Sequence, residues 1–124
     1  MEHYKLVLPE YMNDQGNLFG GYLLKWLDEF AYTTVNLEFP GHRFVTVALD
    51  DVTFRHPIAC GQILRFVVTR ARLGKTSVDY DIGVFTENPS TLAKGVVFGT
   101  RITFVNVDDN GNKSPIPRSG NEAH

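Results

Sequence analysis

The sequence predicts an α+β fold in which one long helix precedes an antiparallel sheet. Two observations lead to this prediction. Apolar residues recur at helical spacing before the pair Pro40-Gly41, and the chain after that pair consists of runs rich in Val, Thr, Ile and Phe separated by turn residues. The length of 124 residues suits a single domain with one core. We therefore expect the apolar face of the helix to lie across one side of a curved sheet.

The helix is expected from Gly20 to about Phe39. Its apolar stripe is Leu23, Leu24, Leu27, Phe30, Ala31, Thr34 and Val35. Pro40-Gly41 ends it. A short strand is expected before the helix, over residues 4–8, and Pro9 ends this strand.

Four strands are expected after the helix, over residues 43–54, 63–73, 77–86 and 92–107. Gly74-Lys75 makes a hairpin turn, and a slip in alternation near Val67-Val68 suggests a bulge. We assign residues 1–112 to one domain. Residues 113–124 are polar and contain prolines, so we expect a flexible tail.

The composition excludes several classes of protein. An apolar content of 43% excludes a disordered chain, and a net charge of −2 with no basic run disfavours nucleic-acid or membrane-surface partners. The N-terminus lacks the apolar region of a signal peptide, and a single cysteine forms no internal disulfide, so a cytoplasmic protein is expected. We interpret Cys60 as structural, and the four scattered histidines predict no metal site.

The segment from Asn13 to Glu29 is the most informative part of the chain. A polar loop leads into a helix that a glycine pair, Gly20-Gly21, opens. Helix N-terminal N–H groups lack partners within the helix, and glycine lets a ligand approach them closely. Asp28 lies at the border of the apolar stripe, where a carboxylate is costly unless it is partnered. The residues alone leave a second interpretation open, in which Asp28 is a solvated side chain and the glycine pair is a plain turn.

Six short motifs, in this order and spacing, resemble the hotdog-fold acyl-CoA thioesterases, in particular the cytosolic acyl-CoA hydrolase branch. They cover residues 13–108: Asn13-x-x-Gly16-x-Leu-Phe-Gly-Gly21, Leu24-x-Trp26-x-Asp28-Glu29, Val45-Thr46-Val47, Phe54-x-x-Pro57-x-x-x-Gly61, Gly74-Lys-Thr-Ser77 and Phe104-Val-Asn-Val-Asp108. The resemblance implies a sheet that wraps the helix and subunits that join their sheets, with active sites at the dimer interface. Asp14, Gln15 and Asn17 stand where many members of the family carry histidine.

The resemblance also implies the catalytic residues. Asn13 and Gly20 of one subunit would face Asp28 and Thr46 of the other. Asp28 would be the general base or nucleophile, Thr46 its polar helper, and Asn13 would orient the water or the thioester. The N–H of Gly20 or Gly21 would stabilise the oxyanion.

Coenzyme A would lie along two short segments, residues 54–57 and 74–77, according to the same resemblance. Arg55, His56 and Lys75 are candidates for phosphate contacts, with Thr76, Ser77 and Gly21 holding the substrate. Solvated surface charges are an equally open interpretation of the three basic residues. No separate cofactor is expected, because coenzyme A is part of the substrate.

The favoured function is hydrolysis of acyl-CoA thioesters by a homodimer or a larger assembly, a tetramer or hexamer. The alternative is a non-catalytic acyl-CoA-binding or acyl-CoA-sensing hotdog protein. A hotdog dehydratase is disfavoured, because no histidine lies between Asn13 and Phe39. The acyl pocket is expected near Leu24, Trp26, Leu27 and Phe30, and the preferred chain length stays open.

Overall fold

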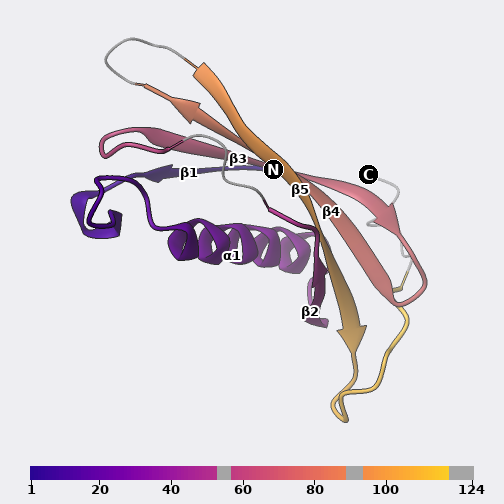
Figure 1. Cartoon of the computed structure of the whole chain (residues 1–124). Helices are drawn as coiled ribbons and strands as arrows, with labels where there is room; N and C mark the ends of the chain where they lie inside the picture. Colours follow the sequence, from indigo (N-terminus) through magenta and orange to yellow (C-terminus); the bar gives the residue numbers. More distant parts are fainter. Residues whose placement is uncertain (53–56, 89–93, 118–124) are drawn as a thin grey trace.

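The computed structural model describes residues 1–52, 57–88 and 94–117. One helix, α1 (Gly20–Glu38), lies along the concave side of a curved sheet, with a short 3₁₀ helix, η1 (Pro9–Tyr11), before it (Figure 1). The sheet has five antiparallel strands in the order β1-β3-β4-β5-β2. Their bounds are β1 (Glu2–Leu6), β2 (Arg43–Leu49), β3 (Ile63–Leu73), β4 (Ser77–Glu87) and β5 (Lys94–Val107). The predicted α+β arrangement is confirmed.

The apolar face of α1 supplies one side of the core. Its buried residues are Leu23, Trp26, Leu27, Ala31, Thr34 and Val35. Leu24, expected within the stripe, is instead 37% exposed, and Trp26 takes its place in the core with 4% exposure. The helix ends where the N–H of Phe39 donates to the carbonyl of Val35, directly before Pro40. Within the described part of the chain, no helix combines the length and apolar character that crossing a membrane requires.

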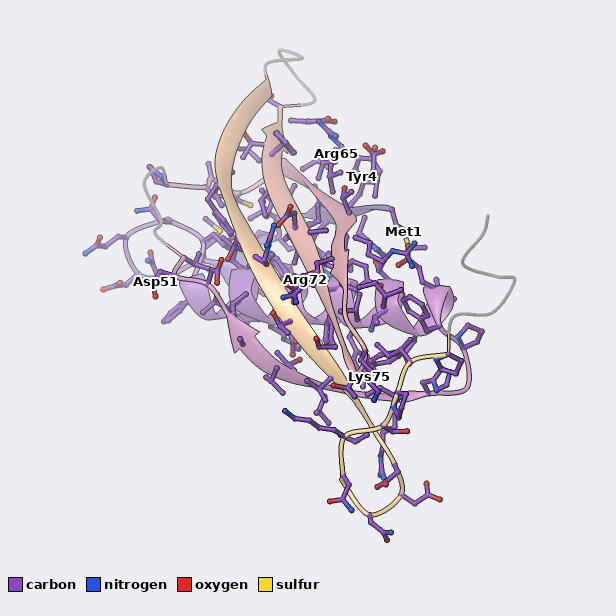
Figure 2. All side chains as sticks on the ribbon, turned by 90° about the vertical axis from the view of Figure 1, so that its right-hand side faces the viewer. Met1, Tyr4, Asp51, Arg65, Arg72 and Lys75 are labelled. Carbon is purple, nitrogen blue, oxygen red and sulfur yellow. The ribbon has the colours of Figure 1, made fainter. Side chains whose placement is uncertain are left out.

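The two faces of the sheet differ in polarity. The alternate residues of β4 that face the core, Val78, Tyr80, Ile82 and Val84, are buried. The outer face carries ion pairs: Arg65 contacts Glu2 and Glu87 at 3.0 Å each, and Arg101 contacts Asp81 at 2.7 Å. Figure 2 shows Arg65 beside Tyr4 at one end of the sheet and Lys75 near the other end.

Several boundaries differ from the sequence prediction. The first strand lies two residues earlier, and β2 ends at Leu49, while the last two residues of its predicted range lie outside the described residues. The bulge expected at Val67-Val68 lies between Arg70 and Arg72, because the pairing with β4 is continuous until there.

Residues 113–117 are attached to the fold, although the sequence suggests a flexible tail from Lys113. Ser114 N–H donates to the carbonyl of Asn106, and Ile116 N–H donates to that of Lys75, both at 2.8 Å. The buried Asn106 side chain donates through Nδ2 to the carbonyls of Ser114 and Pro115. Ile116 is only 3% exposed. The domain therefore extends past residue 112, to Ile116 at least.

Strand β2 forms one edge of the sheet. It pairs with β5 on one side, from Arg43 opposite Val107 to Leu49 opposite Ile102, and no described strand pairs with its other side. Val45, Val47 and Leu49 are 41%, 55% and 39% exposed. An apolar strand edge with free backbone groups is a surface on which another strand can pair.

Candidate active site

A hydrogen bond joins the helix to this edge strand. Asp28 lies two turns inside α1, and its carboxylate oxygen Oδ1 accepts a hydrogen bond of 3.0 Å from Oγ1 of Thr46 in β2. Both side chains are exposed. One turn further along the helix, Tyr32 packs against Phe104, the residue opposite Thr46 in β5, with ring centroids 6.3 Å apart. Helix packing and strand register together bring the two predicted residues to one place.

A β-bulge follows Thr46 directly. Thr46 pairs with Phe104 and Ala48 pairs with Thr103, so Val47 is the additional residue. A bulge bends its strand and redirects neighbouring side chains, and bulges are common beside active sites. In this chain the bulge interrupts the regular pairing of β2 with β5 directly after the residue that contacts Asp28.

The Asn13 side chain organises the loop before the helix. Its Oδ1 accepts hydrogen bonds from the N–H groups of Gln15 at 2.9 Å and Asn17 at 3.0 Å. Gly16 has φ = +77°, a left-handed conformation that favours glycine. The Asn13 oxygen therefore holds the loop, and the Nδ2 group is the part of the amide that can donate to a ligand.

The N-terminus of α1 is accessible. The helix begins at Gly20, and the N-cap residue Phe19 makes no side-chain capping hydrogen bond. A Cβ added at Gly21 would meet no atom within 4 Å. Unpaired N–H groups at a helix N-terminus, with open space in front of them, suit a carbonyl oxygen that gains negative charge.

The glycine pair and Asp28 of one subunit are too far apart to act on the same atom. Gly20 and Asp28 are eight residues apart in α1, which is about 12 Å along the helix axis. A nucleophile or base and an oxyanion donor must both lie about 3 Å from the reacting group. If both groups act in one reaction, each chain therefore presents two half-sites.

The predicted coenzyme A residues fall into two groups. Lys75 is exposed in the β3–β4 turn, where the Thr76 carbonyl accepts from Asn106 N–H at 2.8 Å. Ser77 begins β4 opposite Val105, which is opposite Val45 in β2, so the turn lies about 10 Å, two strand spacings, from the Asp28–Thr46 edge. The other group, Arg55 and His56, lies outside the described residues.

Among the described residues predicted for the site, Asp28 and Thr46 are the one pair that a hydrogen bond joins. The sequence interpretation did not predict that Leu24 and Tyr32 would be exposed. Leu24 lies one turn before Asp28 and is 37% exposed, and Tyr32 lies one turn after it and is 47% exposed. Their signal is the four-residue spacing from Asp28. The expected pocket residues Trp26 and Leu27 belong to the core instead.

Cys60 and His3 do not join Asp28. Cys60 is an exposed free cysteine. The ring of His3 stacks on Phe30 at 4.6 Å, and its Nε2 lies 3.1 Å from Oγ1 of the buried Thr34. Burial, with a smaller effect of the N-terminal charge, lowers the pKa of His3. The imidazole of His3 therefore packs between β1 and α1.

Comparison with known proteins agrees with the resemblance. The family model of the thioesterase superfamily matches residues 15–93. VdlD of Helicobacter pylori is 33% identical over 113 residues, which cover 91% of this chain and 64% of that protein. This chain therefore spans less than two thirds of the length of that relative.

Two solved structures are similar along nearly the whole chain. A hexameric broad specificity acyl-coenzyme A thioesterase superposes with a TM-score of 0.85 at 27% identity, over 97% of this chain and 82% of that one. An acyl-CoA hydrolase from Staphylococcus aureus, in complex with butyryl coenzyme A, coenzyme A and coenzyme A disulfide, has a TM-score of 0.84 at 27% identity, over 94% and 71%. Variants of the latter with an aspartate, a threonine or an asparagine replaced by alanine have also been solved. The predicted hotdog fold is confirmed, and this chain belongs to the thioesterase superfamily.

Proposed function

We propose that this chain hydrolyses acyl-CoA thioesters to the free acid and coenzyme A. The observation that carries the proposal is the exposed Asp28 carboxylate, held by Thr46 at 3.0 Å on the unpaired edge of the sheet. The similarity to acyl-CoA thioesterases supports the choice of substrate.

The proposed reaction needs a base or nucleophile and an oxyanion donor. Asp28 either takes a proton from a water that attacks the thioester carbonyl, or attacks that carbon itself and forms an anhydride that water then hydrolyses. In both routes the C–S bond breaks and coenzyme A leaves as the thiolate, which takes up a proton. Thr46 donates to one oxygen of Asp28 and so leaves the other oriented for the reaction. The N–H of Gly20 or Gly21 stabilises the oxyanion, and the Nδ2 group of Asn13 holds the water or the thioester.

Two subunits would complete each site. The 12 Å axial separation of Gly20 and Asp28 within one helix means that the half-sites of a single chain cannot meet. We infer a homodimer in which Asn13 and Gly20 of one subunit face Asp28 and Thr46 of the other. The exposed edge of β2 gives the second copy a strand to pair with. A similar structure is hexameric, which supports an assembly of such dimers.

The coenzyme A arm would pass the β3–β4 turn, with Lys75 as a phosphate contact and Thr76 and Ser77 beside the arm. Arg55 and His56 remain predicted contacts outside the described residues. Two further expectations stay predictions: the reaction needs no cofactor besides its substrate, and the protein is cytoplasmic.

The proposal is tested by incubating the protein with acyl-CoAs from acetyl to palmitoyl and titrating the thiol released. Hydrolysis of at least one ester, above the rate of the Asp28→Asn variant, supports it. Binding of acyl-CoA without thiol release would favour the non-catalytic alternative.

A further inference from the structure

We propose that Tyr11 is a positioning residue, which holds the loop of residues 13–17 at the start of α1, and that the Lys5 ammonium keeps the Tyr11 ring in place. The inference rests on the proposed function, because the position of this loop affects turnover only if Asn13 and Gly20 act on the thioester. The sequence interpretation assigns no role to Tyr11 or Lys5.

Three aromatic rings pack together where the chain enters the helix. The ring centroid of Tyr11, in η1, lies 4.8 Å from that of Tyr22 and 5.0 Å from that of Trp26, and the two helix rings are 5.9 Å apart. The Tyr11 and Trp26 rings meet at 78°, an edge-to-face contact of the kind that aromatic pairs favour. Trp26 is 4% exposed and belongs to the core. The Tyr11 ring therefore packs against the first two turns of the helix.

A lysine faces two of these rings. Nζ of Lys5, in β1, lies 5.3 Å from the ring centroid of Tyr11 and 5.3 Å from that of Trp26. A cation within about 6 Å of an aromatic ring centroid is attracted by the negative face of the ring. None of the ion pairs between described side chains includes Lys5, so these two rings are the partners that the described part of the chain gives to its charge. Lys5 therefore links β1 to both η1 and α1.

The backbone of Tyr11 holds the other end of the loop. Its carbonyl accepts a hydrogen bond of 3.0 Å from the N–H of Phe19, the residue directly before Gly20, and Met12 and Leu18 form a β-bridge beside it. The Phe19 side chain is 56% exposed and makes no capping hydrogen bond, so backbone contacts hold the start of the helix. Tyr11 is therefore connected to the helix start twice, through its ring and through its carbonyl.

A shift of Tyr11 would move both groups that the proposed site needs. Asn13 follows it by two residues, and the N–H groups at the start of α1 follow the residue that its carbonyl holds. The N–H of Leu18 also donates to the carbonyl of Ile58 at 3.0 Å, a second attachment that keeps the loop on the fold when Tyr11 is changed. Loss of the Tyr11 ring should therefore displace the loop, and a displacement of about 1 Å can lower turnover about a hundredfold.

Paired substitutions separate the ring from the charge. Tyr11→Leu removes the aromatic contacts, whereas Tyr11→Phe keeps the ring; Lys5→Met removes the charge, whereas Lys5→Arg keeps a cation. We expect kcat to fall about tenfold or more in Tyr11→Leu and about threefold in Lys5→Met, and to stay within about twofold in the two conservative variants. KM for acyl-CoA should stay within about twofold in all four, because the proposed phosphate contact is in another turn.

The opposite end of the helix provides a matched control. The Arg70 guanidinium lies 5.4 Å from the ring centroid of Phe39, so it makes the same kind of contact directly after α1. Arg70→Met should lower the midpoint of thermal unfolding about as much as Lys5→Met does, and it should leave kcat within about twofold of the unmodified protein. An equal loss of kcat in Arg70→Met would show a general effect of stability and would overturn the proposal.

Hydrogen exchange gives a second measurement, which does not depend on hydrolysis. The N–H groups of Asn13, Leu18 and Phe19 are hydrogen-bonded in and around the loop. They should exchange about tenfold faster in Tyr11→Leu with native circular dichroism, and at the original rate in Arg70→Met. If Tyr11→Leu does not fold, Lys5→Met gives the answer by the same two measurements.

Unchanged exchange in the folded variant would overturn the proposal, as would faster exchange with full kcat. The thiol assay on the unmodified protein separates this result from the proposed function. An active enzyme with unchanged exchange keeps the activity and loses the role of Tyr11. A protein that hydrolyses no acyl-CoA refutes the proposed function, and hydrogen exchange then decides alone whether Tyr11 holds the loop.

Discussion

Removing the Thr46 hydroxyl should slow turnover while leaving the fold intact. Thr46→Val keeps the shape of the side chain and loses the 3.0 Å hydrogen bond to Asp28. A hydrogen bond to a charged group contributes about 1.5–3 kcal/mol. Each 1.36 kcal/mol of transition-state stabilisation changes the rate tenfold. Solvent can replace part of this hydrogen bond, because both residues are exposed. We therefore expect kcat to fall about tenfold to a hundredfold. Thr46→Ser should restore most of the rate.

The sheet provides a matched control. Thr103 Oγ1 donates to a carboxylate oxygen of Asp79 at 2.7 Å on the outer face of the sheet, opposite the face that α1 covers. Thr103→Val removes the same kind of hydroxyl–carboxylate hydrogen bond and should leave kcat unchanged. Steady-state thiol release with a saturating acyl-CoA measures both variants, and thermal unfolding checks that both are folded. Full activity in Thr46→Val, or an equal loss in Thr103→Val, would refute the assigned role of Thr46.

Three further results are expected. Burial, and then the 2.6 Å hydrogen bond to Glu38, raise the pKa of Tyr80. A raised pKa in the folded state means that folding favours the neutral phenol. The stabilisation that Tyr80 contributes is therefore fully present below the unfolded pKa of about 10 and is lost as the pH rises above it. Tyr80→Phe should lower the free energy of unfolding in urea by about 1–2 kcal/mol at neutral pH and should reduce the loss of stability at alkaline pH. Cys60→Ser should keep turnover within about twofold, and a loss of two or more orders of magnitude in the folded variant would indicate a cysteine nucleophile instead. Lys75→Ala should raise KM for coenzyme A esters without changing KM for truncated pantetheine esters, and an equal rise with both would exclude a phosphate contact.

The helix and the strands could be predicted because each has a local signal, whereas the pairing of Asp28 with Thr46 came from the family resemblance. The helix bounds follow from apolar periodicity and from Pro40, and β4 follows from its alternation. The exposure of Leu24 could not be predicted, because periodicity alone does not say which border residue of a wide apolar face enters the core. Trp26 does so by packing against Tyr11, with ring centroids 5.0 Å apart, a contact between distant segments.

The bulges and the attached tail depend on tertiary contacts that no local pattern encodes. The extra residue Val47 is visible only from the pairing of β2 with β5. Residues 113–117 appear flexible by composition, but the buried amide of Asn106 holds them through two side-chain hydrogen bonds. The division of each proposed active site between two subunits came from the family resemblance, and the separation of Gly20 and Asp28 along one helix supports it.

The most direct test of the central claim is complementation between two inactive variants. Asp28→Asn removes the base or nucleophile and should reduce turnover by about 10²–10⁴-fold. Asn13→Asp keeps the oxygen that holds the loop through Gln15 and Asn17 but replaces the Nδ2 donor, so it removes the proposed contact without opening the loop. Each homodimer should be nearly inactive and should still fold.

Mixing the two variants under conditions that exchange subunits should restore activity. Half of the dimers then contain one chain of each kind, and each of these holds one site with both native residues, so about one quarter of the wild-type activity is expected for an isologous dimer. Recovery near that level would show that Asp28 of one subunit acts with Asn13 of the other. No recovery, with exchange demonstrated by differently tagged chains, would place both residues in one subunit's site, and full activity in Asp28→Asn alone would remove the catalytic role of Asp28.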